Sequence, residues 1–210
     1  MKRLLSTLFG IALALPAFAQ SVSVKEGNIQ FTNKTGQTTT LTSSGHDSDP
    51  SLSPDGKTIV FARATPERKV PTGSGDDTSE IWLLGVDGKN ARKIVEPKAA
   101  EKTEAILAEL STPQFSSDGT KIFFETTAWT TSGAIHVFDL ATKKEYFVCA
   151  GGGLEVIHSG EYKDCLLVTQ HRYFIGGGSY DWVWLLRSDG KEVGPVGEDT
   201  ANFKDLYLKK

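Results

Sequence analysis

One turn-and-strand sequence occurs twice in this chain and constrains the fold more than any other feature. The first copy reads SLSPDGKTIVFAR at Ser51–Arg63, and the second reads QFSSDGTKIFFET at Gln114–Thr126. In each copy the Asp-Gly pair supplies side-chain hydrogen bonding and a permissive backbone for a tight turn. The β-branched and aromatic residues that follow are typical of a strand buried on both faces. The chain therefore repeats one antiparallel unit.

A second hairpin follows each copy, so the repeated unit contains four strands. Ser79–Glu96 and Gly133–Cys149 both read as a strand, a tight turn and another strand. A blurred third unit covers Val156–His171 and Tyr180–Val196. Residues 27–42 read as the last two strands of a further unit, with SVSV as a strand ahead of them. The C-terminal NFKDLYL is then available as the missing strand of that unit.

Stacked four-stranded units of roughly 40–45 residues indicate a β-propeller. We expect an all-β fold, a small propeller of about four four-stranded blades, closed by one strand from each terminus so that sheet edges are protected. An open, incomplete propeller is the alternative. Between two blades, Thr103, Ile106, Leu107 and Leu110 recur at helical spacing, which predicts a short helix near residues 98–110.

The repeat resembles that of the TolB-like propellers, which are related to the WD-type repeats. The first unit matches their typical pattern at Pro50, Ser53-Pro54-Asp55-Gly56-Lys57, Phe61, Ile81-Trp82 and Asp87-Gly88. The second unit matches at Pro113, Ser117-Asp118-Gly119, Phe124 and Ile135, with Ser117 in place of the usual proline. The resemblance is strong over residues 47–150 and weak elsewhere. TolB-like propellers usually have more blades than this chain can supply, so the resemblance leaves the blade number open.

The first nineteen residues read as a secretory signal peptide. Lys2 and Arg3 precede an apolar run that ends in Ala17-Phe18-Ala19, which predicts cleavage before Gln20. A membrane anchor is the alternative, but the run is shorter than the roughly 20 apolar residues that a bilayer span needs. We therefore expect residues 20–210 to form a single β-propeller domain, exported to the periplasm, without a membrane span.

The charge of the chain bears on its partners, and its two cysteines bear on a possible disulfide. The formal net charge is −3 and no basic cluster lies outside the predicted signal peptide, so the sequence disfavours nucleic acid as a partner. The only cysteines are Cys149 and Cys165. Because an exported protein meets an oxidising environment, we expect a disulfide between them. Two buried free thiols are the alternative.

The lengths of the connections predict one plain face and one elaborated face. The turns within SPDG, SSDG, VDGK and SDGK are tight, whereas the connections between second and third strands, and between blades, are long. In a four-stranded blade these long connections emerge on the same side, and variable loops on a rigid scaffold commonly bind ligands. The predicted partner-binding residues on this side are Asp76, Asp77, Trp129, His171, Arg172, Tyr173 and Tyr180, with Arg68, Lys69 and Phe174 nearby.

Aromatic residues and arginine are enriched among residues that dominate protein interfaces, which favours a binding role for this set. The alternative is that Trp129 and Phe174 fold back as caps over their blades. Trp182 and Trp184 alternate with Val183 in a strand and are predicted to belong to the core.

No motif in the sequence points to catalysis, a cofactor or a metal. The four histidines are scattered, no Gly-x-Ser-x-Gly motif is present, and the acidic stretches lack the spacing of a calcium loop. The favoured hypothesis is a monomeric, non-catalytic module that binds a periplasmic or cell-envelope protein, in its sharpest form an immunity protein that inhibits a toxin. The competing hypothesis is a small propeller hydrolase or lyase that acts on a glycan or peptide.

Overall fold

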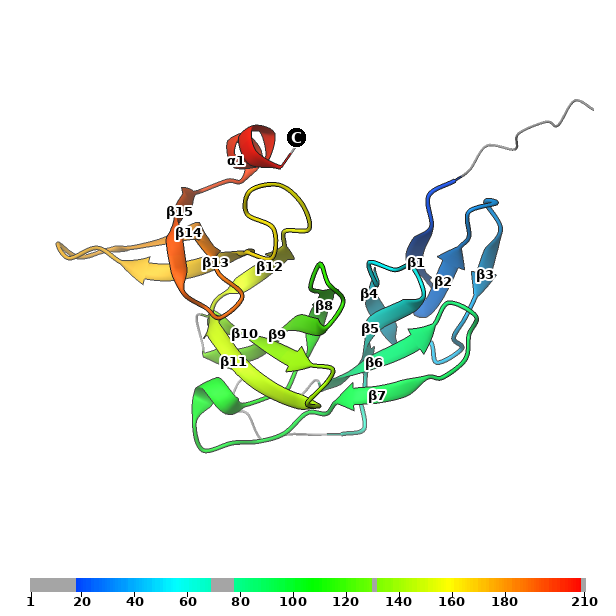
Figure 1. Ribbon diagram of the computed structural model, residues 1–210. Helices are drawn as coiled ribbons and strands as arrows, with labels where there is room; N and C mark the ends of the chain where they lie inside the picture. Colours follow the sequence, from blue (N-terminus) through cyan, green and yellow to red (C-terminus); the bar gives the residue numbers. More distant parts are fainter. Residues whose placement is uncertain (1–17, 69–77, 130–131, 209–210) are drawn as a thin grey trace, which may run out of the picture.

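The computed structural model describes residues 18–68, 78–129 and 132–208 (Figure 1). Its strands form four antiparallel sheets, one of three strands and three of four. The first sheet contains β1 (Ser21–Lys25), β2 (Asn28–Thr32) and β3 (Thr38–Thr40). The second contains β4 (Asp47–Leu52), β5 (Thr58–Ala64), β6 (Ser79–Gly85) and β7 (Arg92–Val95).

The third and fourth sheets repeat the order of the second. The third contains β8 (Ser111–Phe115), β9 (Lys121–Trp129), β10 (Ser132–Asp139) and β11 (Lys144–Ala150). The fourth contains β12 (Gly152–Val156), β13 (Leu166–Tyr173), β14 (Ser179–Leu186) and β15 (Glu192–Gly197), and is followed by helix α1 (Ala201–Tyr207). The predicted all-β propeller of four-stranded units is therefore confirmed.

The sheets stand around one side of a common axis, with β4, β8 and β12 innermost (Figure 1). The ring is open between the first sheet and the fourth, and both described ends of the chain lie on this open side. The expected closure by a C-terminal strand is wrong, and the alternative of an open propeller describes the structure.

The C-terminal segment forms α1 because the fourth sheet would otherwise expose an apolar face. Leu167 and Leu185 are buried on that face, and Phe203 and Leu208 from the C-terminal segment pack against them. The Tyr162 and Phe203 ring centroids are 5.5 Å apart, which extends the cover. A strand paired with the first sheet could not provide this cover.

The repeated turn has the same hydrogen bonds in both copies. The Ser53 hydroxyl donates to Asp55 Oδ1 over 2.7 Å, and the Ser116 hydroxyl donates to Asp118 Oδ1 over 2.6 Å. In the second copy, the bond from Ser116, together with the bonds from the backbone N–H and hydroxyl of Thr120, lowers the pKa of Asp118 to about 2. The carboxylate therefore stays ionised and holds the turn closed.

Apolar cores lie between successive sheets, as the doubly buried strands predicted. Ile59 and Phe61 of β5 pack toward the first sheet, while Val60 and Ala62 pack toward the third. Each of these side chains is at most 2% exposed. Full burial of a side chain such as Phe61 stabilises the fold by about 1.5–3 kcal/mol, so sheet-to-sheet packing holds the blades together.

The connection between β7 and β8 contains a single 3₁₀ turn at Thr103–Ala105 rather than a longer helix. Lys98 and Leu107 exchange two backbone hydrogen bonds, which closes the segment into a loop. Leu107 and Leu110 are buried in the core between the second and third sheets. Their spacing reflects this burial and not an amphipathic helix.

The expected disulfide is absent, and both cysteines are free thiols. Cys149 packs in the core between the third and fourth sheets, whereas Cys165 packs against the opposite face of the fourth sheet. A sheet therefore separates the two sulfur atoms. Burial raises the pKa of the Cys149 thiol to about 12, which keeps it protonated at neutral pH.

We predict that Gly56→Val destabilises the protein. Gly56 has a φ of +70°, and a Cβ at this position would lie 2.5 Å from Gln20 Oε1. A β-branched residue held in this left-handed conformation costs about 1–3 kcal/mol. Thermal unfolding should show a lower midpoint for Gly56→Val than for Gly194→Val, because a Cβ at Gly194 meets nothing within 4 Å. Equal midpoints would contradict this account of the turn.

Candidate functional site

The hairpin of β13 and β14 projects from the fourth sheet, at the left of Figure 1. Its pairs run from Leu166 and Leu186 at the base to Tyr173 and Ser179 at the tip without a register shift. The tip is closed by two backbone bonds of 3.0 Å between Phe174 and the glycines Gly177 and Gly178. These glycines have φ values of +95° and +84°, which a residue with a side chain rarely adopts.

One face of the hairpin carries a stripe of stacked aromatic rings. The Tyr180 centroid lies 4.6 Å from that of Phe174 and 4.8 Å from that of Trp182. Phe174 is 52% exposed. Trp184 continues the same face toward the base of the hairpin and packs against the core between the third and fourth sheets. The stripe thus runs from the protein core out to the exposed tip.

The opposite face and the tip expose further bulky residues. Tyr173 is 73% exposed, and its ring centroid lies 5.0 Å from that of His171. The imidazole of His171 is in turn held by a hydrogen bond of 2.9 Å between Nδ1 and Asp181 Oδ1. Ile175, at the end of the hairpin, is fully exposed. Because apolar side chains exposed together are common at interaction sites, the tip of the hairpin is a candidate interaction surface.

Arg172 is packed within the fourth sheet, so it fixes the hairpin. Its guanidinium lies 3.5 Å from the ring centroid of Trp184. Its Nε donates to Gln170 Oε1 over 3.1 Å, and it is ion-paired with Glu192 on β15. The side chain is 27% exposed. These contacts tie β13, β14 and β15 together below the exposed rings.

Trp129 belongs to a different cluster, on the third sheet. It makes an edge contact with Phe147 at 6.3 Å between centroids, and Phe147 makes another with His136 at 5.6 Å. Within the described part of the chain, no ring contact joins Trp129 to the hairpin aromatics. The predicted aromatic set is therefore two clusters on successive blades.

The other residues predicted for the binding face belong to the long connection after β5, which the structure describes only in part. Asp76, Asp77 and Lys69 lie outside the described residues. Arg68 donates to Glu96 Oε2 and to the carbonyl of Pro97, each over 3.1 Å, so it holds the start of the connection between β7 and β8.

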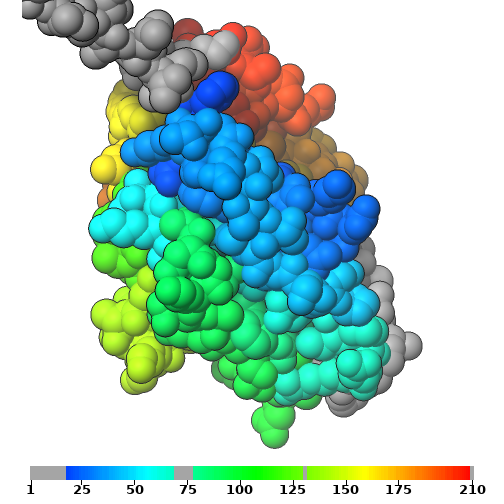
Figure 2. Space-filling model, turned by 90° about the vertical axis from the view of Figure 1, so that its right-hand side faces the viewer, coloured from blue at the N-terminus to red at the C-terminus, as the bar shows by residue number. Residues whose placement is uncertain are grey.

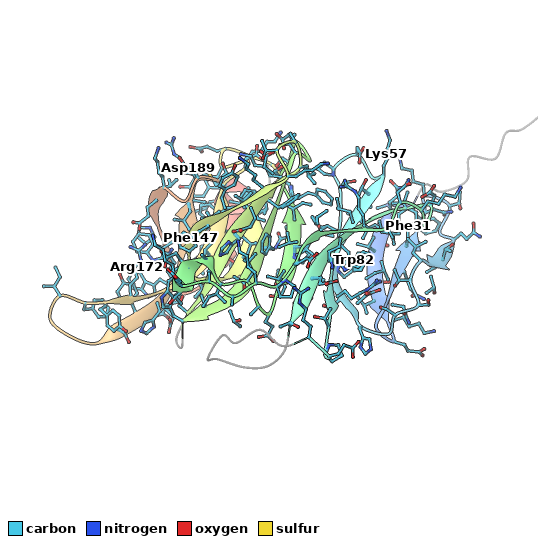
Figure 3. The ribbon with its side chains drawn as sticks, turned by 90° about the horizontal axis from the view of Figure 1, so that it is seen from below. Phe31, Lys57, Trp82, Phe147, Arg172 and Asp189 are labelled. Atoms are coloured by element: carbon cyan, nitrogen blue, oxygen red, sulfur yellow. The ribbon has the colours of Figure 1, made fainter. Side chains whose placement is uncertain are left out.

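The tight turns lie away from the hairpin. Lys57 and Asp189, which mark two of these turns, lie on one side of the molecule in Figure 3, and Arg172 lies toward the other. The predicted division into a plain face and an elaborated face thus matches the positions of these turns.

Outside the hairpin, a hydrogen-bonded pair of titratable side chains lies on the third sheet. His136 is fully buried, with Nδ1 bonded to Glu145 and no partner for Nε2 among the described residues. Burial opposes ionisation of Glu145, but hydrogen bonds from His136 and Lys98 hold its pKa below the ordinary value. No group of three or more metal-ligating side chains occurs within the residues that the structure describes.

Two contributors to the hairpin surface were not predicted as site residues. Trp182 was assigned to the core, yet it is only partly buried and stacks on Tyr180. The alternation of Tyr180, Trp182 and Trp184 contained this signal, because residues two apart share one face of a strand. Ile175 was missed because a single apolar residue in a glycine-rich loop gives no pattern.

Comparison with solved structures identifies the fold. TolB from Acinetobacter baumannii superposes with a TM-score of 0.55 at 14% identity, over 85% of this chain and 40% of that chain. A putative TolB from Agrobacterium tumefaciens also gives a TM-score of 0.55, at 16% identity, over 80% of this chain and 56% of that chain. This chain has a TolB-like β-propeller fold.

A third solved structure is also similar to this chain. The β-propeller domain of the Trilobed protease from Pyrococcus furiosus, described as having an open velcro topology, matches with a TM-score of 0.51 at 21% identity, over 80% of this chain and 47% of that chain. The TolB-like chain spans about half the length of these solved structures. No protein-family model and no curated protein matches the sequence.

The TolB-like propeller has no helix among its described residues that is long and apolar enough to cross a membrane.

We predict that substitutions at two neighbouring hairpin residues differ in their effect on stability. Arg172→Ala removes the stacking on Trp184 and the bond to Gln170, so it should lower the free energy of unfolding by about 1–2 kcal/mol. Tyr173→Ala removes an exposed ring and should change it by less than about 0.5 kcal/mol. Chemical denaturation of both variants checks this. Equal losses would mean that Tyr173 is a structural cap.

Proposed function

We propose that this propeller is an exported, non-catalytic module that binds a protein partner through the β13–β14 hairpin. The observation that carries the proposal is the set of large side chains exposed at its tip, Tyr173 at 73%, Phe174 at 52% and Ile175 at full exposure. Burial of bulky apolar side chains against a partner contributes most to the free energy of binding.

The hairpin is also preorganised for binding. Ring stacking along Phe174, Tyr180 and Trp182 limits the freedom of the exposed side chains. Arg172 locks the base of the same stripe against Trp184. A surface that is rigid before contact loses little conformational entropy on binding, which favours affinity. A projecting hairpin of this kind fits a concave apolar site on the partner.

The predicted signal peptide supports a periplasmic location, and we propose a periplasmic or cell-envelope protein as the partner. In the sharpest form of the proposal the partner is a toxin, and the chain is its immunity protein. A projecting hairpin suits inhibition because it can enter and block a concave site.

Capture of a partner from periplasmic extract, followed by titration of hairpin variants, tests the proposal. Tyr173→Ala and Ile175→Ala should each weaken binding by about 1–4 kcal/mol, the usual range for residues that dominate an interface. Their unfolding midpoints should match the unsubstituted protein, because both side chains are exposed.

Lys89→Ala and Lys191→Ala provide the matched control, since both lysines are exposed at tight turns of the plain face. They should leave the affinity unchanged. Equal weakening by hairpin and turn variants would contradict a hairpin interface, and weakening that follows the loss of thermal stability would assign these residues a structural role.

A further inference from the structure

The first sheet lacks the innermost strand that every other sheet has. Val22 of β1 pairs with Phe31, just as Val60 of β5 pairs with Leu83 and Phe123 of β9 pairs with Val137. The backbone carbonyl of Gly27, in the β1–β2 turn, accepts from Asp47 N, and two blades later the carbonyl of Gly133 accepts from Gly151 N in the same way. β1 is therefore a second strand, and the position inside it is vacant among the described strands.

The backbone groups on this vacant side can be assigned from the hairpin geometry. Glu26 and Gly27 have φ values of 53° and 68°, which is the two-residue turn whose flanking residues, Lys25 and Asn28, are a hydrogen-bonded pair. Pairing then alternates, so Ser23 bonds to β2 while Val22 and Val24 point their N–H and C=O groups away from it. The bond from Leu41 N to Ile29 O agrees, because the residue opposite Val24 turns its carbonyl toward β3.

The other blades show what such an edge accepts. In each of the other three blades, the innermost strand pairs one residue with the residue equivalent to Val22. These residues are Ser51, Gln114 and Glu155, and all three are polar. Gln114 shows how the side chain is used. Its Nε2 donates to Leu154 O over 2.7 Å and its Oε1 accepts from Val156 N over 3.0 Å, so the amide bridges to the innermost strand of the next blade.

Among the residues that the structure describes, the two chain ends near the vacancy make contacts elsewhere. The chain enters β1 from the β2–β3 turn, where Phe18 N bonds to Lys34 O over 2.9 Å. At the C-terminus, Lys204 of α1 is ion-paired with Glu155, and Phe203 packs on the fourth sheet. The vacant edge faces the inside of the arc beside β4 (Figure 1). In the other three sheets a single strand of five or six residues occupies the equivalent position, so one extended segment is the matching occupant.

We propose that the inner edge of β1 binds an extended segment of a partner protein, which completes the first blade as an antiparallel fourth strand. Main-chain hydrogen bonds to Val22 and Val24 provide the affinity, as in other cases of strand addition. A polar residue opposite Val22, preferably glutamine, provides specificity by reaching the backbone of β4 as Gln114 reaches that of β12. This site lies in the first sheet and does not depend on the β13–β14 hairpin.

A synthetic peptide with the sequence of residues 111–117, STPQFSS, is the probe, because this segment fills the equivalent position in the third blade. The fluorescently labelled peptide should bind the purified protein saturably, and a peptide carrying the Q114P change should not. Val24→Pro in the protein should weaken binding about tenfold or more, since proline removes an outward N–H and blocks the edge.

Thr40→Pro is the matched control, because it alters the opposite edge of the same sheet and should leave peptide affinity unchanged. Tyr173→Ala should also have no effect, which separates this site from the hairpin. Absence of saturable binding, or equal weakening by Val24→Pro and Thr40→Pro in folded protein, would overturn the proposal. Self-association that Val24→Pro abolishes would also overturn it, by making a second copy the occupant.

Discussion

Burial of both faces of each blade is the constraint on which the rest of the structure depends. A twisted sheet with two apolar faces is stable only when each face is covered, and here successive sheets cover one another through three cores. An open arc leaves two faces at its ends. The outward face of β1–β3 carries polar residues such as Ser23, Gln30 and Thr32. The first sheet, in blue, forms the upper part of the surface seen in Figure 2.

At the other end, α1 covers the apolar face of the fourth sheet through Phe203 and Leu208. One end is therefore polar and the other is covered by a helix, an arrangement similar to the capping repeats of solenoid proteins. The arc consequently needs no closing strand to bury its apolar surface. A strand edge in the first sheet and an aromatic hairpin in the last remain exposed, and we propose a binding role for each.

Much of this fold could be predicted from the sequence, because the repeated turn and the doubly apolar strands are local signals. Ser53 and Asp55 form the same turn bonds as Ser116 and Asp118, as the repetition indicated. The C-terminal helix could not be predicted in this way, since it depends on an exposed face of a distant sheet. For the hairpin, the aromatic content indicated a surface, but only the structure shows that Arg172 is packed on Trp184 while Tyr173 is exposed.

The central claim is that the protein is an open propeller whose first blade lacks its innermost strand. Residue-resolved amide hydrogen exchange tests this claim most directly. The amides of Val22 and Val24 should exchange at least about tenfold faster than those of Ser23 and Lys25, because only the latter pair is hydrogen-bonded to β2. This alternation along a single strand is the predicted result. Equal protection of all four amides would show that the inner edge of β1 is already paired and would contradict the account.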